Sequence, residues 1–128
     1  MKSISISHIK KIFKREIEYL IDGVSNVSNP YHFLSLSTLD NQEVKSRTVI
    51  LRNVEKKPLA LYFNADYRSP KIKQLLDYNT CSILVYDQKR KMQLRANCQA
   101  KIHYQNSVSK QIWNNTPLQS RKCYMGEL

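Results

Sequence analysis

The first strong pattern along the chain is helical. From Ser7, apolar residues recur at steps of three and four positions, while lysine and arginine fill the other side of the same turns. The apolar positions are Ile9, Ile12, Phe13, Ile17, Leu20 and Ile21. This spacing predicts an amphipathic helix over about residues 7–23, ending near Gly23, whose basic side faces either solvent or an anionic surface.

The rest of the chain predicts mostly short strands separated by turns. The clearest signal runs from Met92 to His103, where apolar and polar residues alternate, so one face is predicted to be core and the other wet or functional. A short helix is predicted after Ser69-Pro70, and another is predicted around Trp113. The predicted strands span 31–39, 44–54, 59–64, 81–87 and 92–103. Strands in this order, with helices at both ends and one inserted before the fourth strand, predict an α+β fold built on an antiparallel barrel.

Composition narrows the class of protein. The 128 residues suffice for one apolar core, and no apolar run approaches the roughly 20 residues that cross a bilayer. We expect one domain over residues 1–128, soluble and cytoplasmic, because no secretory signal follows Met1 and no membrane partner is indicated. The histidines lack metal-ligand spacing, so no metal site is predicted. Cys81, Cys98 and Cys123 lie far apart in the sequence and predict reduced thiols.

Charge and glycine content together indicate what kind of ligand to expect and how the chain would bind it. A formal charge of +11 and a pI near 9.7 indicate a chain that meets anions. With two glycines, the chain cannot build the glycine-rich loops that cradle phosphates in nucleotide-binding folds. A bound phosphate would need side-chain cations and a helix N-terminus, and Arg68, Ser69 and Lys71 surround such a helix start. An ordinary Ser-Pro helix start with exposed basic neighbours is the alternative.

Further candidate groups lie on the predicted strands. Arg47 shares a face with Val49 and Leu51, so it is either buried against an anion or reaches water near the strand end. Arg52, five positions further on, points to the opposite face. Gln93 lies beside an arginine on the polar face of the fifth strand, and an amide with a guanidinium can hydrogen-bond a heterocycle. Ordinary cross-strand pairing on the surface explains Gln93 equally well.

The order of these segments resembles a known family. "RTVILR", "LYFNADYRSPKIKQL", "SILVYD" and "MQLRANCQAKIH", followed by Trp113 and a Ser-Arg pair, resemble the pyridoxamine 5′-phosphate oxidase-like FMN-binding split barrels over about residues 33–124. The resemblance implies an antiparallel split β-barrel with flanking helices. It also implies a homodimer that holds FMN at the subunit interface and acts on a small-molecule substrate. Family members continue through a further strand, so this chain is expected to be C-terminally short.

The resemblance also implies roles for individual residues. Arg47 would contact the FMN phosphate or ribityl chain, and the backbone of residues 49–51 would meet the isoalloxazine ring. Gln93 would reach the flavin from the same barrel or from the partner subunit. The positions implied for FMN are Arg47, Val49, Ile50, Leu51, Arg52, Tyr62, Phe63, Asn64, Arg68, Ser69, Lys71 and Gln93, and those implied for substrate are Arg52 and Ser120.

The predicted function is that of an FMN-dependent oxidoreductase without an assigned substrate or catalytic side chain. Of the family's substrate-phosphate cluster, the stretch after the fifth strand retains Ser120, which argues against pyridoxamine phosphate as the substrate. Two alternatives stay open: a flavin- or heme-binding protein without turnover, and a basic barrel that binds nucleic acid. The dispersed basic residues and the lack of a paired stacking motif make nucleic acid the less favoured partner.

Overall fold

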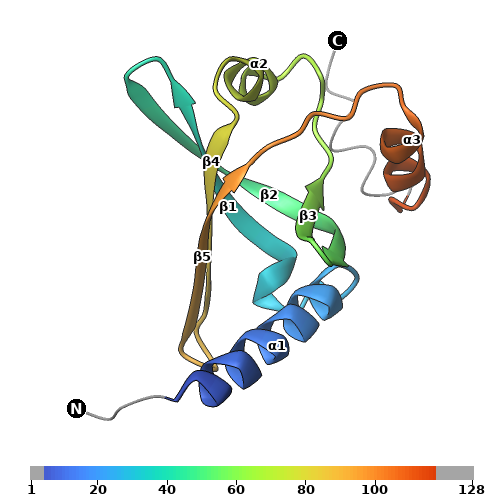
Figure 1. Cartoon of the computed structure of the whole chain (residues 1–128). Helices are drawn as coiled ribbons and strands as arrows, with labels where there is room; N and C mark the ends of the chain where they lie inside the picture. The colour runs from blue at the N-terminus through green and yellow to red at the C-terminus, as the bar shows by residue number, and fades with distance from the viewer. Residues whose placement is uncertain (1–4, 118–128) are drawn as a thin grey trace.

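The structure, a computed structural model, describes residues 5–117 and folds them as helices around one antiparallel sheet (Figure 1). Helix α1 begins the fold, a short 3₁₀ helix η1 leads into the first strand, α2 lies between β3 and β4, and α3 follows β5. The elements are α1 (Ile6–Gly23), η1 (Pro30–His32), β1 (Phe33–Asp40), β2 (Glu43–Lys56), β3 (Leu59–Phe63), α2 (Pro70–Asp77), β4 (Thr80–Asp87), β5 (Met92–Gln99) and α3 (Ser107–Asn114).

The sheet is curled into a half-barrel. Its strand order is β3-β2-β1-β4-β5 and every neighbouring pair is antiparallel. The long strand β2 pairs with both β1 and β3, and its register with β3 shifts between Leu51 and Asn53. A bulge of this kind bends a strand and increases its twist, and β4 and β5 turn away from β2 and β3 (Figure 1). The predicted α+β split-barrel class is confirmed.

Alternation along the strands separates a core face from an outer face. On the core face, β1 and β2 contribute Leu34 and Leu51, both 0 % exposed, and β4 contributes Ile83 at 4 %. Each such side chain contributes about 1.5–3 kcal/mol by leaving water. The residues between them point to the opposite side, which we call the outer face: Phe33, Ser35, Ile50, Leu84, Tyr86, Gln93 and Arg95.

The end of β5 and the start of β1 differ from the sequence prediction. Strand β5 ends at Gln99, not at His103, although its alternation of burial continues to Ile102. The reason is the partner strand: β4 begins at Thr80, which pairs with Gln99, so later residues have no strand to pair with. The predicted strand at 31–39 likewise starts later, because its first two residues form η1.

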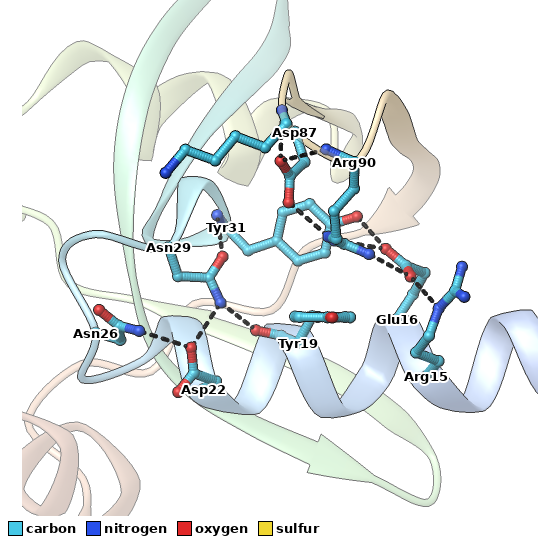
Figure 2. A network of polar contacts seen from close by, with 10 residues as sticks. Arg15, Glu16, Tyr19, Asp22, Asn26, Asn29, Tyr31, Asp87 and Arg90 are labelled. Carbon is cyan, nitrogen blue, oxygen red and sulfur yellow. Dashed lines mark hydrogen bonds and ion pairs between the residues drawn. The ribbon is translucent and has the colours of Figure 1, made fainter.

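A buried polar network, which the sequence pattern did not predict, holds α1 against the sheet (Figure 2). The Arg90 guanidinium donates to both carboxylate oxygens of Glu16, at 2.8 and 3.0 Å, and its Nε donates to Asp87 at 2.6 Å. The Tyr31 hydroxyl also donates to Glu16. Arg90 lies over the Tyr19 ring, 3.6 Å from its centre. Helix α1 is therefore attached to the β4–β5 turn by charge as well as by apolar contact.

The apolar side of α1 is covered less than its pattern predicted. Leu20 is 2 % exposed, whereas Ile9 and Phe13 are 53 % and 54 % exposed. Glu16, an ion-paired residue, takes a buried position at 4 % exposed. The predicted helix is confirmed. Its first two turns, however, lie largely outside the core that residues 5–117 form. None of the helices in residues 5–117 combines the length and apolar character needed to cross a membrane.

Candidate functional site

A cationic cluster lies where α2 meets β1 and β2, and Arg47 is its centre. The Arg47 Nη1 donates to the Leu36 carbonyl at 3.2 Å and to the Thr38 hydroxyl at 2.7 Å. Its Nη2 donates to Gln74 Oε1 at 3.0 Å, and the Thr38 hydroxyl donates to the same oxygen at 2.6 Å. Thr38 and Gln74 are both buried. These bonds fix the guanidinium beside α2 without neutralising its charge.

Lys71, in the first turn of α2, brings a second cation near Arg47. Burial lowers the pKa of Lys71, and the positive charge of Arg47 lowers it further, while Asp66 opposes the shift. Burial also lowers the pKa of Arg47. Two neighbouring cations in a partly dehydrated position repel each other, so an anion bound between them would relieve an unfavourable interaction.

Ser69 adds an unsatisfied hydroxyl to this position. It is the N-cap residue of α2, yet its side chain makes no capping hydrogen bond. Its Oγ is buried and has no hydrogen-bond partner within residues 5–117. A buried hydroxyl left without a partner costs about 1–3 kcal/mol, and an anionic oxygen would satisfy it. We call Arg47, Ser69 and Lys71 the anion corner.

Arg68, which was predicted to contact a phosphate, instead pairs with a neighbouring carboxylate. Its side chain is exposed and forms a two-pronged pair with Asp66, Nε to Oδ1 at 3.0 Å and Nη2 to Oδ2 at 2.7 Å. These bonds lower the pKa of Asp66 to about 2. In this structure Arg68 is occupied by a carboxylate, so its contact with a phosphate stays a prediction.

A large apolar cavity opens beside the anion corner. It has a volume of about 810 Å³, lies on the core side of the sheet, and is lined by Lys71 together with residues of α1, β3 and α3. This is within the range of small-molecule sites. Tyr62, Phe63 and Asn64 line it as well. The Tyr62 hydroxyl donates to Glu55 at 2.7 Å, and Asn64 Nδ2 donates to the Thr116 hydroxyl at 2.6 Å.

The structure gathers some of the predicted positions and separates others. Arg47 and Lys71 lie together at the anion corner with Ser69, and Lys71 shares the cavity wall with the end of β3. Val49 and Leu51 are buried in the core. Ile50 and Gln93 lie on the outer face, half-buried and exposed respectively, while Arg52 lies at the β2 bulge. Ser120 falls outside the described residues.

Two residues of this site were missed from sequence. Thr38 and Gln74 position Arg47, but neither belongs to a recognisable motif. Thr38 did carry a signal, since it follows Leu34 and Leu36 on the core-facing parity of the strand. A polar residue at a buried position needs a hydrogen-bond partner, and here that partner is Arg47. Gln74 had no such signal, because its burial depends on how α2 docks.

Comparison of the sequence with known protein families identifies the family of this chain. The family described as the FMN-binding domain of pyridoxamine 5′-phosphate oxidase matches residues 10–104. The chain belongs to this family. The match spans α1 from Lys10 onward, the whole half-barrel and α2, and therefore includes the anion corner.

Solved structures agree on the fold of this family member. A pyridoxamine 5′-phosphate oxidase-related, FMN-binding protein from Nostoc punctiforme superposes with a TM-score of 0.63 at 17% identity, covering 88% of this chain and 55% of its own. A candidate pyridoxamine 5′-phosphate oxidase from Listeria innocua gives a TM-score of 0.66 at 18% identity, covering 91% of this chain and 84% of its own. The chain thus spans about half the length of the Nostoc protein. No curated protein matches the chain.

Proposed function

We propose that this chain binds FMN and holds its phosphate at the anion corner. The observation that supports this most directly is the placement of Lys71 and Arg47, two partly buried cations whose charges repel. The unsatisfied Ser69 hydroxyl at the start of α2 supplies a donor at the same place. The first turn of α2 contains no acidic residue that would repel a phosphate. The residues present therefore fit the phosphate of the group that the family name implies.

Each residue of the corner has a distinct task in this proposal. Arg47, held by Thr38 and Gln74, presents a fixed guanidinium, and Lys71 adds a point charge from α2. Ser69 would donate a hydrogen bond to the phosphate, because its Oγ has no hydrogen-bond partner within residues 5–117. When bound, FMN would supply the hydride and electron chemistry of an oxidoreductase acting on a small molecule. The protein's own contribution would be to position the cofactor and offset its charge.

A homodimer completes the proposal. Gln93 and Ile50 lie on the outer face, on the opposite side of the sheet from Leu51 and the other core residues. That face also exposes Phe33 and Leu84, each 44 % exposed, and Tyr86 at 53 %. An exposed apolar patch of this kind is typical of a protein interface. A second copy docked there would cover the patch and bring its own Gln93 toward the flavin.

The test of FMN binding compares two flavins that differ by one phosphate. Titration of the purified protein with FMN and with riboflavin, followed by flavin fluorescence, is expected to show FMN bound at least about tenfold more tightly, or roughly 1.4 kcal/mol. Equal affinities would mean that the phosphate does not reach the anion corner. A protein that takes up neither flavin but binds oligonucleotide with steep salt dependence would favour the nucleic-acid alternative.

A further inference from the structure

Two cysteines that are far apart in the sequence face each other in the sheet. The register of β4 and β5 pairs Cys81 directly with Cys98. The backbone N–H of Ala100 donates to the carbonyl of Asn79 at 2.7 Å, and these two residues continue the same register two positions away. Directly opposite residues alternate between hydrogen-bonded and non-hydrogen-bonded pairs. The cysteines therefore form a hydrogen-bonded pair, with Cα atoms about 5.5 Å apart.

That separation suits a disulfide, for which the Cα atoms usually lie about 5.5–6 Å apart. The Cβ atoms of a disulfide lie about 3.5–4.5 Å apart, closer than those of a hydrogen-bonded pair, so closing the bond draws the two strands together locally. Both side chains are on the core face and both line the apolar cavity, from which a small molecule can reach the half-buried Cys98. We propose that Cys81 and Cys98 form a redox-modified pair that closes to a cross-strand disulfide by exchange with a small-molecule disulfide. This site lies outside the anion corner and does not depend on flavin binding.

The exchange proceeds in two balanced steps. The Cys98 thiol loses its proton and attacks the small disulfide, giving a mixed disulfide and releasing one thiol. The Cys81 thiol then loses its proton and attacks the Cys98 Sγ, which releases the second thiol. Two protein thiols are oxidised, one small disulfide is reduced, and both protons leave on the released thiols. Cys98 reacts first because it is half-buried, whereas Cys81 is 8 % exposed.

The position of the pair gives the bond a structural effect. Strand β5 lies at the edge of the sheet, so within residues 5–117 β4 is its one strand partner. The pair is next to the last rung of this ladder, Thr80 with Gln99. Burial raises the pKa of both thiols, so at neutral pH they stay protonated. Closing the bond would fix the edge strand at the cavity wall.

The experiment uses the full chain with Cys123→Ser, so that two thiols are present. After incubation with oxidised glutathione, mass spectrometry should show a monomer lighter by two hydrogens without bound glutathione, and thiol titration should fall from two to none. The melting temperature should rise by about 10 °C over the reduced form, because the bond closes a loop of intermediate length. Peptide mapping of the chain with its native Cys123 should identify the same Cys81–Cys98 link.

The control is Cys98→Ser in the Cys123→Ser chain. It should gain no thermal stability on oxidation and should form no internal link. Two results would overturn the proposal. One is a stable glutathione adduct on Cys98 with Cys81 still free. The other is a folded protein that keeps both thiols while the same chain, unfolded in urea and treated in parallel, forms the disulfide.

Discussion

At the scale of single residues, the candidate site depends on two cations, Arg47 and Lys71, that form no salt bridge within residues 5–117. Within residues 5–117, the Arg47 side chain donates its hydrogen bonds to neutral groups: a backbone carbonyl, Thr38 and Gln74. Arg68, three residues before Lys71, is instead paired with Asp66 and exposed. Basic residues close in sequence therefore differ in what they can offer a ligand. The partly buried cations at the anion corner are therefore the ones whose charges an anion would stabilise most.

Replacing Lys71 tests this difference. Lys71→Met removes a charge-assisted contact to phosphate and is expected to weaken FMN binding by about 1.5–3 kcal/mol. Riboflavin affinity should change little, because riboflavin has no phosphate. Isothermal titration with both flavins measures the two effects.

The matched control is Lys73→Met, which removes the same charge from an exposed position of the same helix. It should leave the preference for FMN intact. If both variants weaken FMN equally, the effect comes from the overall positive charge and the anion corner is misplaced.

At the scale of elements, α1 shows how an amphipathic pattern can be right about the helix and incomplete about its packing. Burial favours protonation of Glu16, but hydrogen bonds from Arg90 and Tyr31 and the charge of Arg90 hold the Glu16 pKa below its ordinary value of 4.5. Burial and the bond to Glu16 raise the Tyr31 pKa to about 12. The carboxylate and the phenol therefore keep these charge states through the neutral range. The network joins α1 to the β4–β5 turn over 74 positions of sequence.

This network makes a prediction about acid stability. A carboxyl whose pKa is lower in the folded state stabilises the fold above its unfolded pKa and loses that contribution as the pH falls through the folded pKa. Glu16→Gln should reduce the free energy of unfolding at neutral pH by about 3 kcal/mol, because Arg90 loses a buried charged partner. The variant should also lose less stability than the parent between neutral pH and about pH 3. Chemical denaturation at a series of pH values measures both.

The control on the same helix is Glu18→Gln. Glu18 pairs with Lys56 at 2.9 Å, but both side chains are more than half exposed, at 57% and 58%. Loss of such a surface pair should cost less than about 1 kcal/mol. If the two variants lose similar free energies of unfolding, burial of the Glu16 network adds nothing to stability.

At the scale of the whole molecule, the half-barrel leaves apolar surface on the outer face. The exposed Leu84 and Tyr86 alternate with buried Ile83 and Val85, so the strand β4 is apolar on both faces. A strand of this kind is expected where both faces of a sheet are covered. The inner face is covered by the protein's own core, and the proposed second copy would cover the outer one.

Disrupting the outer face tests the dimer. Leu84→Lys places a charge in the exposed apolar patch and is expected to shift the protein from dimer to monomer in analytical ultracentrifugation. FMN binding should weaken with it, since Gln93 would no longer arrive from a second copy. Val27→Lys is the control, because Val27 is 66 % exposed outside the sheet. A parent protein that sediments as a monomer at all concentrations would contradict the proposed assembly.

The sequence by itself determined the local elements and the family resemblance. Alternation between Met92 and Gln99 and the three- and four-residue spacing after Ser7 depend on which side of one element is apolar, and that information is local. The Ser-Pro start of α2 was equally local. These features also gave the fold class, because hairpins and inserted helices restrict the possible topologies.

Tertiary structure alone decided which distant residues meet. Arg47 reaches Gln74 across 27 positions, Glu16 reaches Arg90 across 74, and Cys81 faces Cys98 because of strand register. It also ended β5 at Gln99, where its partner strand stops, and left Ile9 and Phe13 exposed despite their apolar pattern. The physical reason is the same in each case: burial, pairing and pKa depend on neighbours that the folded chain brings from elsewhere, and residue spacing does not encode those neighbours.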